Sequence, residues 1–443
     1  MKWFVYNCLF AVAYLAMLPS FLLRMKRRGG YRARMGDRFG RYPAQIAARF
    51  AAGARRPVWI HAVSVGEVQV AVQLMRAMRE RDASVRFVFS TTSSTGWKTA
   101  ENELARLAKD GLGGPDDVLV YNPLDFTGCV RRALDRIDPC AVILTETEIW
   151  PNFIRAVRRR GLPLYLVNAR VSDRSAPRYR KLRWFFGEVL RCFTKIYAQS
   201  DLDARRLAEA GADPAAVAVT GSFKFDVARR NPAKEAELAA WIGEPANRCV
   251  LLGGSTWPGE DGVLLRVYAE LVQTHPEATL VLAPRHFEKA DAVEANIRAA
   301  GFACVRRSRG ETPRGGTPRE VFLCDTTGEM MGLFGISTVA FVGKSLCAHG
   351  SQNMIEPCLC GKPTVVGPYT ENFRPVMSDL LAAEALVQAA DEEGVKRALL
   401  AFFDDPRARA AQGGRATAAV RRRCGVVGRC ADELLAALGG ACA

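Results

Sequence analysis

The chain has 443 residues, of which 49% are hydrophobic and 24% are charged, a composition that excludes a largely disordered or collagen-like chain. At about 150 residues per domain, this length predicts two or three domains. Lysine and arginine outnumber aspartate and glutamate by 62 to 46, a net charge of +16, but eleven of the basic residues lie between Arg24 and Arg56 with a single acid. Because the rest of the chain carries little of this excess, no nucleic-acid-binding protein is predicted.

Cysteine and histidine are not arranged as metal ligands. The chain has thirteen cysteines and four histidines, and its most closely spaced cysteine pairs, Cys358 with Cys360 and Cys424 with Cys430, do not form a CxxC motif. An aspartate-rich metal loop is also missing from the sequence. We therefore expect neither a structural zinc site nor a catalytic metal.

The amino-terminal segment is predicted to attach the chain to a membrane. Residues Trp3 to Leu23 contain no charged side chain and are long enough to cross the hydrocarbon core as a helix. The basic residues that follow place that side in the cytoplasm, whereas a cleaved signal peptide has its basic residues before the apolar stretch. We expect residues 1–24 to be a membrane anchor that spans or dips into the bilayer, and residues 25–56 to be a basic membrane-proximal segment.

From Pro57 onward, apolar runs of strand length alternate with amphipathic helical stretches. Buried strands that alternate with helices are typical of a doubly wound parallel sheet covered on both faces. The stretch Asn231 to Arg248 interrupts this alternation, and a second series follows it. We predict an α/β chain with two Rossmann-like doubly wound domains that face a cleft: residues 57–230, a linker over 231–248, and residues 249–443. Ligands of such sheets bind beyond the carboxyl ends of the strands.

Three loops of the first domain carry candidate residues. Glu67 follows the first strand in HAVSVGE, and it is either an acid that suits the helix dipole or a general base aimed into the cleft. The dipole lowers the pKa of such an acid, whereas a base that acts near neutral pH needs a raised pKa. Glu146 and Glu148 end the strand in TETE, as cleft residues or as partners of basic groups. Six basic residues from Arg170 to Arg183 indicate either an anionic ligand or a solvated helix face.

Lys224 and the loops of the second domain complete the candidates. Lys224 lies between two phenylalanines near the linker, and it either faces the cleft or is a surface lysine with a buried stem. In the second domain, polar and glycine residues follow four strands: Gly253–Glu260, Pro284–His286, Asp325–Met330 and Gly343–Pro357. Each segment alone is a weak signal, because the P-loop and GxGxxG spacings are missing. Together they predict a nucleotide pocket at one edge of the sheet.

The motifs HAVSVGE, TETEIWPN, NARVSDRS, TGSFKFD, APRH, DTTGEMM and FVGKSL with HGSQNMIEP resemble the 3-deoxy-D-manno-octulosonic acid (Kdo) transferases of lipid A assembly. The resemblance covers nearly the whole chain and includes the amino-terminal anchor. It implies an inverting glycosyltransferase of the GT-B fold that works without a metal or another cofactor. It also implies CMP-Kdo as donor and a lipid A precursor as acceptor, in the cytoplasmic leaflet of the inner membrane.

The same resemblance implies roles for individual residues. Glu67 corresponds to the general base, and Glu146 and Lys224 correspond to residues that stabilise the transition state. The implied CMP-binding positions are Pro284, Arg285, Thr327, Gly328, Glu329, Asn353, Met354, Ile355 and Glu356. Two alternatives remain open at this point: a sugar-nucleotide epimerase of the same fold, and a membrane-attached binding protein without catalysis.

Three departures from the family pattern concern contacts with the donor. Lys344 stands where the family usually has a glycine, and HGSQN replaces the commoner GGxN run. Ser337 and Thr338 replace an acidic residue that often precedes the FVG strand. These departures affect contacts with the donor and leave the reaction class unchanged.

Overall fold

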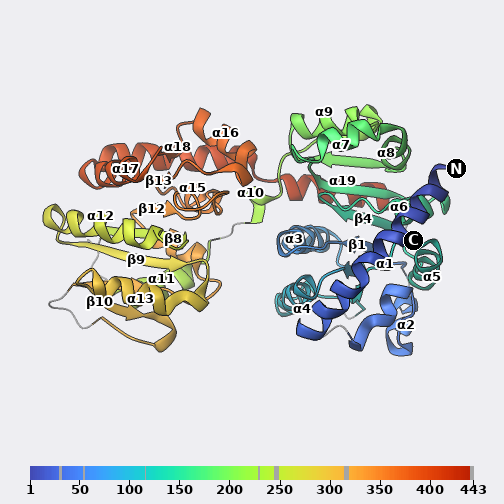
Figure 1. Cartoon of the computed structure of the whole chain (residues 1–443), viewed down its shortest axis with the longest axis horizontal. Helices are drawn as coiled ribbons and strands as arrows, with labels where there is room; N and C mark the ends of the chain where they lie inside the picture. The colour runs from blue at the N-terminus through green and yellow to red at the C-terminus, as the bar shows by residue number, and fades with distance from the viewer. Residues whose placement is uncertain are drawn as a thin grey trace. The chain divides into compact units, whose positions relative to one another are not determined.

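The computed structural model describes two compact units of the chain. The described residues are 1–28, 32–52, 55–114, 116–227, 230–243, 249–313 and 319–439. We call Met1–Phe223 with Gly425–Ala443 the N-terminal domain, and Lys224–Cys424 the C-terminal domain. Figure 1 shows each of them as a sheet with helices on both faces.

Within the described residues, the N-terminal domain contains a seven-stranded parallel sheet of order β3-β2-β1-β4-β5-β6-β7. Its strands are β1 (Val58–His61), β2 (Phe87–Thr91), β3 (Val118–Tyr121), β4 (Ala141–Thr145), β5 (Leu164–Ala169), β6 (Lys195–Ala198) and β7 (Val217–Val219). Side chains of β1 alternate between two hydrophobic clusters, with Ile60 in one and Trp59 in the other. Both faces of the sheet are therefore buried, which explains why the strands read as continuous apolar runs.

Helices cover both faces of this sheet. They are α3 (Val65–Arg81), α4 (Ser94–Lys109), α5 (Thr127–Ile137), α6 (Pro151–Arg159), α7 (Ala176–Lys181), α8 (Arg183–Leu190) and α9 (Asp201–Glu209). Buried residues of α3 belong to the cluster of Ile60, and those of α5 and α6 belong to the cluster of Trp59. The N-terminal domain is thus a three-layer, doubly wound structure.

The C-terminal domain repeats this architecture. In the part of this domain that the structure describes, the sheet has seven parallel strands in the order β10-β11-β9-β8-β12-β13-β14. The strands are β8 (Cys249–Thr256), β9 (Ala278–Pro284), β10 (Ala303–Arg306), β11 (Glu320–Leu323), β12 (Val339–Val342), β13 (Thr364–Val366) and β14 (Val387–Gln388). Its helices include α12 (Glu260–Thr274), α13 (Ala290–Ala299), α16 (Arg374–Ala382), α17 (Glu392–Asp404) and α18 (Pro406–Arg423). The predicted fold class, two doubly wound parallel α/β domains, is confirmed.

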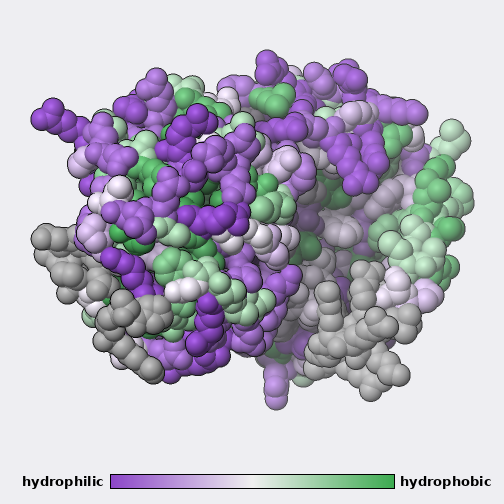
Figure 2. All heavy atoms as spheres, turned by 60° about the vertical axis from the view of Figure 1, so that its left-hand side comes forward, coloured by the Kyte–Doolittle hydropathy of each residue, from purple (hydrophilic) through white to green (hydrophobic). Residues whose placement is uncertain are grey.

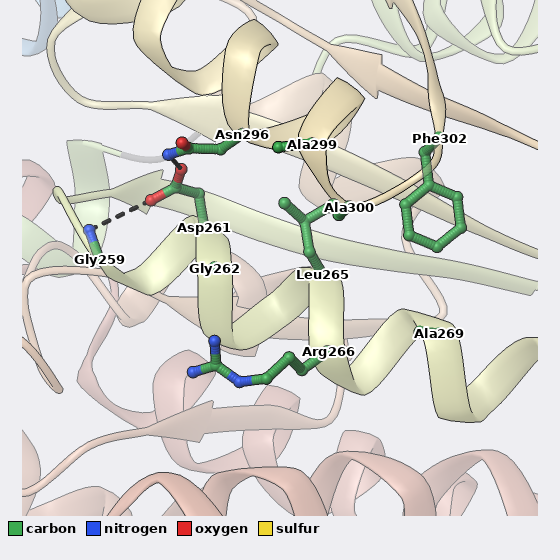
Figure 3. A pocket seen from close by; sticks show the side chains of 10 residues that line it. All are labelled: Gly259, Asp261, Gly262, Leu265, Arg266, Ala269, Asn296, Ala299, Ala300 and Phe302. Carbon is green, nitrogen blue, oxygen red and sulfur yellow. Dashed lines mark hydrogen bonds between the residues drawn. The ribbon is translucent and has the colours of Figure 1, made fainter.

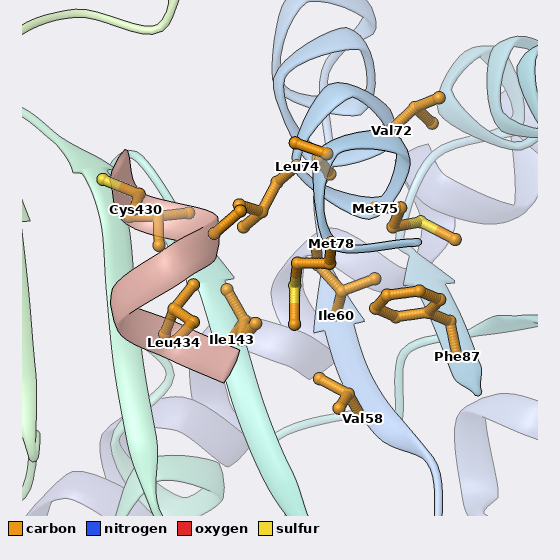
Figure 4. Close-up of a cluster of buried hydrophobic side chains, with 14 of the residues drawn as sticks. Val58, Ile60, Val72, Leu74, Met75, Met78, Phe87, Ile143, Cys430 and Leu434 are labelled. Atoms are coloured by element: carbon orange, nitrogen blue, oxygen red, sulfur yellow. The ribbon is translucent and has the colours of Figure 1, made fainter. Parts of the chain in front are cut away.

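The domain boundaries differ from the predicted ones at both ends of the C-terminal domain. Helix α19 (Val426–Leu438) lies in the predicted domain 249–443, but its Cys430 and Leu434 join the buried cluster around α3 and β1 (Figure 4). Helix α11 (Pro232–Trp241) lies in the predicted linker, but it buries Leu238 and Trp241 in the C-terminal core. Sequence periodicity shows that a helix has an apolar face but not which sheet that face covers.

The predicted membrane-proximal segment 25–56 is also partly a domain element. Its later residues form a 3₁₀ segment (Arg32–Phe39) and helix α2 (Ala44–Ala51). Asp37 is fully buried and accepts a hydrogen bond from Tyr121 N (3.2 Å), while Arg38 Nη2 donates to Thr92 O (2.6 Å). At least Arg38 therefore serves the fold instead of facing a membrane.

Helix α1 (Lys2–Arg28) lies along the N-terminal domain. Its segment Lys2–Ser20 is long and apolar enough to cross a membrane by length and composition. The rings of Trp3 and Tyr6 lie 5.5 and 5.4 Å from that of Phe185 in α8, and Phe10 lies 5.0 Å from Phe126. One face of α1 thus packs against the folded domain.

Candidate active site

The strand order of the N-terminal sheet reverses between β1 and β4, and the main site candidates of this domain flank that point. Glu67 lies in the first turn of α3, directly after β1, and Glu146 is the first residue after β4. In open parallel sheets, ligands bind beyond the strand ends at such a switch point. The structure therefore brings Glu67 and Glu146 to the edge where the prediction placed them.

Glu67 closes a capping box at the start of α3. Its backbone N–H donates to Ser64 Oγ (3.3 Å), and its Oε2 accepts from the N–H groups of Val63 (2.8 Å) and Ser64 (3.0 Å). No hydrogen bond to Oε1 is found within the described part of the chain. The helix-start interpretation is thus correct in geometry, and it leaves one carboxylate oxygen available for a substrate.

The electrostatic surroundings of Glu67 suit a general base. The side chain is 7% exposed, and this burial raises its pKa. The hydrogen bonds from Ser64 and Val63 oppose the rise, while the charges of Glu148 and Glu146 add to it. The net effect is a raised pKa, so burial and neighbouring carboxylates outweigh the hydrogen bonds at the helix start.

Glu146 is a buried carboxylate with a basic partner. Its Oε2 accepts from Arg170 Nε (2.7 Å), and its Oε1 accepts from Asn168 Nδ2 (3.2 Å). Glu146 and Asn168 both have positive φ angles, 49° and 53°, in the region that favours glycine. Such backbone strain at a strand end is typical of functional sites, where the surrounding contacts hold it. Asn168 Oδ1 also accepts from Phe223 N (3.0 Å), so this cluster connects the loops after β4, β5 and β7.

His61 was not among the predicted site residues, and it lies beside Glu148, the second acid of TETE. His61 ends β1 and is fully buried, with Nδ1 2.9 Å from Ser90 Oγ and Nε2 3.6 Å from Glu148 Oε2. Glu148 also accepts a hydrogen bond from Trp150 Nε1 (2.8 Å). The position of His61 at the end of a buried strand was a usable signal, because a buried imidazole needs polar partners.

Lys224, the third predicted catalytic residue, begins the C-terminal domain in α10 (Lys224–Val227). Its Nζ lies 5.1 Å from the centroid of the Phe373 ring, a cation–π distance. The buried phenylalanines on either side, Phe223 and Phe225, belong to different domains.

In the C-terminal sheet, the strand order reverses between β8 and β12, and a buried carboxylate occupies that point. Glu260 in the first turn of α12 is fully buried. Its Oε1 accepts from Ser345 N (3.0 Å), Leu346 N (3.0 Å) and Cys347 N (3.4 Å). Its Oε2 accepts from Trp257 N (2.8 Å) and Lys344 N (2.9 Å). These amides hold a carboxylate of the protein itself, so they are not an open anion site.

The predicted CMP-binding residues lie at or after the ends of β9, β11 and β12, at one edge of the sheet. Pro284 ends β9, and Arg285 N donates to Thr256 O (3.0 Å). The Arg285 side chain is exposed and has no hydrogen bond or ion pair among the residues that the structure describes. Thr327 and Gly328 form an exposed turn after β11, with Gly328 at φ 83°.

The Glu329 side chain is engaged inside the domain. Its carboxylate pairs with Arg307 (3.0 Å) and accepts a hydrogen bond from Thr326 Oγ1. Although burial raises its pKa, the hydrogen bonds from Arg307 and Thr326 outweigh that effect and lower the pKa of Glu329 to about 2. The Glu329 carboxylate is therefore occupied by Arg307 and Thr326.

The last group of predicted residues surrounds the start of α15 (Ile355–Leu359). Asn353 Oδ1 accepts from Ile355 N (3.0 Å), and its Nδ2 donates to Glu356 Oε1 (3.0 Å). Burial raises the pKa of Glu356, and the hydrogen bond from Asn353 opposes it. Met354 and Ile355 are fully buried in the core, so only Asn353 and Glu356 of this group present polar side chains to a ligand.

Lys344, the departure from the family glycine, lies beside the Pro284–His286 segment. It has a φ of 57°, and its Nζ lies 4.9 Å from the Trp257 ring, which packs on His286 at 5.1 Å. A cavity of about 420 Å³ adjoins these loops. Its lining includes Thr256, Trp257, Pro284, His286 and Lys289.

A second cavity lies between α12 and α13 and is lined by Gly259 but by none of the predicted CMP-binding residues (Figure 3). It measures about 570 Å³ and is lined mainly by small and apolar side chains. Asp261 at its rim accepts hydrogen bonds from Gly259 N (3.1 Å) and Asn296 Nδ2 (2.6 Å). Among the described residues, no group of three or more histidine, cysteine, aspartate or glutamate side chains could hold a metal ion.

Comparisons with known proteins show transferases that are similar to most of the chain. The family model of the 3-deoxy-D-manno-octulosonic-acid transferases (kdotransferases) matches residues 33–227. The 3-deoxy-D-manno-octulosonic acid transferase of Bordetella pertussis is 38% identical over 93% of this chain and 94% of its own length. That of Haemophilus influenzae is 30% identical over 86% and 85%.

Solved structures of the same fold cover most of the chain. Anabaena HepE in complex with UDP has a TM-score of 0.57 at 14% identity and covers 86% of this chain and 100% of its own. A UDP-GlcNAc 2-epimerase from Neisseria meningitidis has a TM-score of 0.56 at 10% identity and covers 86% and 99%. At such low identity these matches show only the fold, whereas the identity and coverage of the transferases show the family. The chain belongs to the Kdo transferases, a family of glycosyltransferases with the GT-B fold.

Proposed function

We propose that this transferase moves Kdo from CMP-Kdo to a phosphorylated lipid A precursor, with inversion at the anomeric carbon. The observation that carries the proposal is the environment of Glu67: a buried carboxylate at the switch point, with a raised pKa and one oxygen that is not hydrogen-bonded by the described residues. A general base needs this combination of access and basicity. Family membership supplies the substrate class.

The reaction is a single displacement. Glu67 takes the proton from an acceptor hydroxyl while that oxygen attacks the anomeric carbon of Kdo, and the bond from that carbon to the phosphate oxygen of CMP breaks. The N–H groups of Val63 and Ser64 fix Glu67 Oε2, so that Oε1 has one defined orientation. Arg285 and Lys224 supply positive charge for the departing phosphate, and the Glu146–Arg170 pair holds the edge of the N-terminal site.

A transfer assay tests the proposal directly. Purified protein should move radiolabel from CMP-Kdo to a detergent-dispersed lipid A precursor, and omission of the acceptor should abolish labelled lipid. UDP-N-acetylglucosamine serves as the control substrate, because an epimerase of this fold would convert it. No labelled lipid, or epimerisation of the control, would contradict the proposal.

The transfer rate should fall as the pH drops through the raised pKa of Glu67, since only the ionised carboxylate accepts a proton. The acid limb of the kcat profile should therefore lie above the usual carboxyl range. Glu148→Gln removes a negative charge that helps to raise this pKa, so the limb should move to lower pH. Exposed Glu392→Gln is the control, and it should leave the profile unchanged. If the acid limb of the kcat profile stayed at the same pH in Glu148→Gln, Glu148 would not raise the pKa of Glu67.

Arg285→Ala should weaken CMP binding about 10- to 100-fold, the range for a lost hydrogen bond to a charged group. Glu356→Ala should also weaken it, because this half-buried carboxylate borders the same sheet edge. Calorimetric titration with CMP measures both effects. Arg397→Ala, an exposed arginine on α17, is the matched control. Unchanged affinity in both Arg285→Ala and Glu356→Ala would place the nucleotide elsewhere.

We further propose that the protein attaches to the inner membrane, with both catalytic domains on the cytoplasmic side, where lipid A precursors are held. The length and composition of the Lys2–Ser20 segment support attachment. The basic residues that follow it, from Arg24 onward, support the cytoplasmic orientation. Attachment keeps the active site close to an acceptor that does not leave the bilayer.

A further inference from the structure

We infer that α1 does not cross the bilayer but lies in the membrane interface, docked on the N-terminal domain, with its outer face in one leaflet of an anionic membrane. This inference deepens the proposed membrane attachment and rests on it. It follows from the polar contacts of the inner face, from the length over which α1 is docked, and from the exposed side chains of the outer face.

The inner face of α1 is tied to the domain by hydrogen bonds. Tyr6 Oη donates to Asp125 Oδ2 (2.7 Å), and Asn152 Nδ2 donates to Asn7 Oδ1 (2.7 Å). One turn earlier, Trp3 Nε1 donates to Glu188 Oε1 (2.7 Å). These polar groups have partners only while α1 stays on the domain, because the hydrocarbon core of a membrane offers none.

Asp125, which binds Tyr6 of α1, is also a structural residue of the N-terminal domain. It is buried, and its carboxylate also accepts hydrogen bonds from Asn152 N (3.0 Å) and Phe153 N (2.8 Å) at the start of α6. Burial raises the pKa of Asp125 to about 6, against the hydrogen bonds from Tyr6, Asn152 and Phe153. Helix α1 thus reaches a carboxylate that is built into the domain.

The docked length is incompatible with a crossing helix. Contacts with the domain run from Trp3 to Tyr14, whose ring lies 5.5 Å from that of Phe126. At 1.5 Å per residue this stretch is about 17 Å long, more than half of the hydrocarbon thickness of about 30 Å. If α1 crossed the bilayer in this arrangement, Asp125, Asn152 and Glu188 would be drawn into the hydrocarbon, which is costly for charged and polar groups.

The outer face of α1 is apolar and uncovered. Its exposed large side chains are Phe4, Val5, Leu9, Val12, Leu15 and Met17. Figure 2 shows hydrophobic side chains gathered along this edge of the molecule, at the right of the view. Exposed Leu182 and Trp184 of the α7–α8 junction extend the surface, since Lys2 Nζ donates to Trp184 O (3.2 Å).

Basic side chains border this apolar surface. Four exposed residues of α7 and the start of α8 make no side-chain hydrogen bond or ion pair within the described ranges: Arg178, Arg180, Lys181 and Arg183. An apolar helix face beside lysine, arginine and tryptophan matches the interfacial region of an anionic leaflet. We call the outer face of α1, Leu182, Trp184 and these four residues the membrane surface.

The depth of α1 in a bilayer distinguishes the two arrangements. We propose nitroxide labels at Leu9, Val12 and Leu15, one at a time, in a Cys8→Ala and Cys347→Ser background that removes the exposed described cysteines. The full chain is bound to vesicles containing phosphatidylglycerol, and depth is measured by collision with oxygen and a nickel chelate. An in-plane helix gives the three labels the same shallow depth. A crossing helix separates the labels at positions 9 and 15 by about 9 Å, which would overturn the inference.

Vesicle co-sedimentation tests the membrane surface. One variant combines Leu182→Ser, Trp184→Ser, Arg178→Gln and Lys181→Gln, and it should bind vesicles at least tenfold more weakly than the wild type. The wild-type protein itself should dissociate from the vesicles as the salt concentration rises. The matched control is Phe287→Ser with Arg421→Gln and Arg422→Gln, exposed residues of the C-terminal domain, which should bind like the wild type. If the variant with four substitutions bound vesicles as tightly as the wild type, Leu182, Trp184 and the basic residues would not belong to the membrane surface. A wild-type chain that binds no vesicles would instead contradict membrane attachment itself.

Discussion

Replacement of Glu67 by glutamine is expected to lower Kdo transfer by about 10²- to 10⁴-fold, the range for a lost general base. The fold should be retained, because glutamine also completes a capping box and its side-chain oxygen can accept from Val63 N and Ser64 N. Glutamine cannot accept the proton of the acceptor hydroxyl. The measurement is kcat with saturating CMP-Kdo, beside a calorimetric titration with CMP, which should be unchanged.

The matched control separates catalysis from capping. Ser64→Ala removes the side chain that accepts from Glu67 N (3.3 Å) and leaves the Glu67 carboxylate in place. It should cost about 1 kcal/mol of stability, as lost N-caps do, with a far smaller effect on transfer. If Glu67→Gln kept near-wild-type turnover, or if both variants lost turnover equally, Glu67 would be a helix-start acid and nothing more.

The case of Glu67 shows how much of the site the sequence could predict. Its place after the first strand and before a helix allowed both roles, and the capping box in the structure leaves Oε1 open for the proposed role as a base. What the sequence left open was the net pKa of Glu67, because that pKa is raised by burial and by the charges of Glu148 and Glu146, which follow another strand. These effects on the pKa depend on distances across the sheet, which cannot be predicted from the spacing of residues in the sequence.

The fold was predictable where contacts are local. Apolar strands that alternate with amphipathic helices predicted two doubly wound sheets, and the structure has them. The assignment of α19 to the N-terminal domain was not predictable, because its partner α3 lies some 350 residues away in the chain. The burial of Asp37 and Arg38 was not predictable for the same reason. Asp37 contacts Tyr121 and Arg38 contacts Thr92, and both partners are distant in sequence.

The segment Gly253–Glu260, from the end of β8 to the start of α12, illustrates the same limit in the second domain. Its glycines predicted an anion held by free N–H groups, but the sequence did not show that Glu260 would supply a carboxylate itself. The N–H groups it binds come mostly from the loop after β12, residues 344–347. Glu260 therefore fixes the loop that carries Lys344, the family departure, next to Trp257.

Glu260→Gln is expected to destabilise the C-terminal domain by about 3 kcal/mol, since a buried carboxylate that accepts five backbone N–H groups loses its charge and part of its hydrogen bonding. Oε1 accepts from three N–H groups and Oε2 from two, so the amide nitrogen of glutamine faces at least two donors in either orientation. For a domain of this size the loss corresponds to about 10 °C in Tm.

Thermal unfolding followed by circular dichroism measures the effect, and calorimetric titration with CMP reports on the neighbouring loops. Glu392→Gln is the matched control: it removes the same charge from an exposed position, where the ion pair with Arg266 (2.5 Å) is worth no more than about 1 kcal/mol. CMP affinity should fall in Glu260→Gln and not in the control, because the loop that carries Lys344 loses its anchor. A Tm for Glu260→Gln within about 2 °C of the control corresponds to a loss of under 1 kcal/mol and would contradict this prediction. The backbone N–H groups of residues 344–347 would then be hydrogen-bonded by water, and an anion could bind at the switch point between β8 and β12.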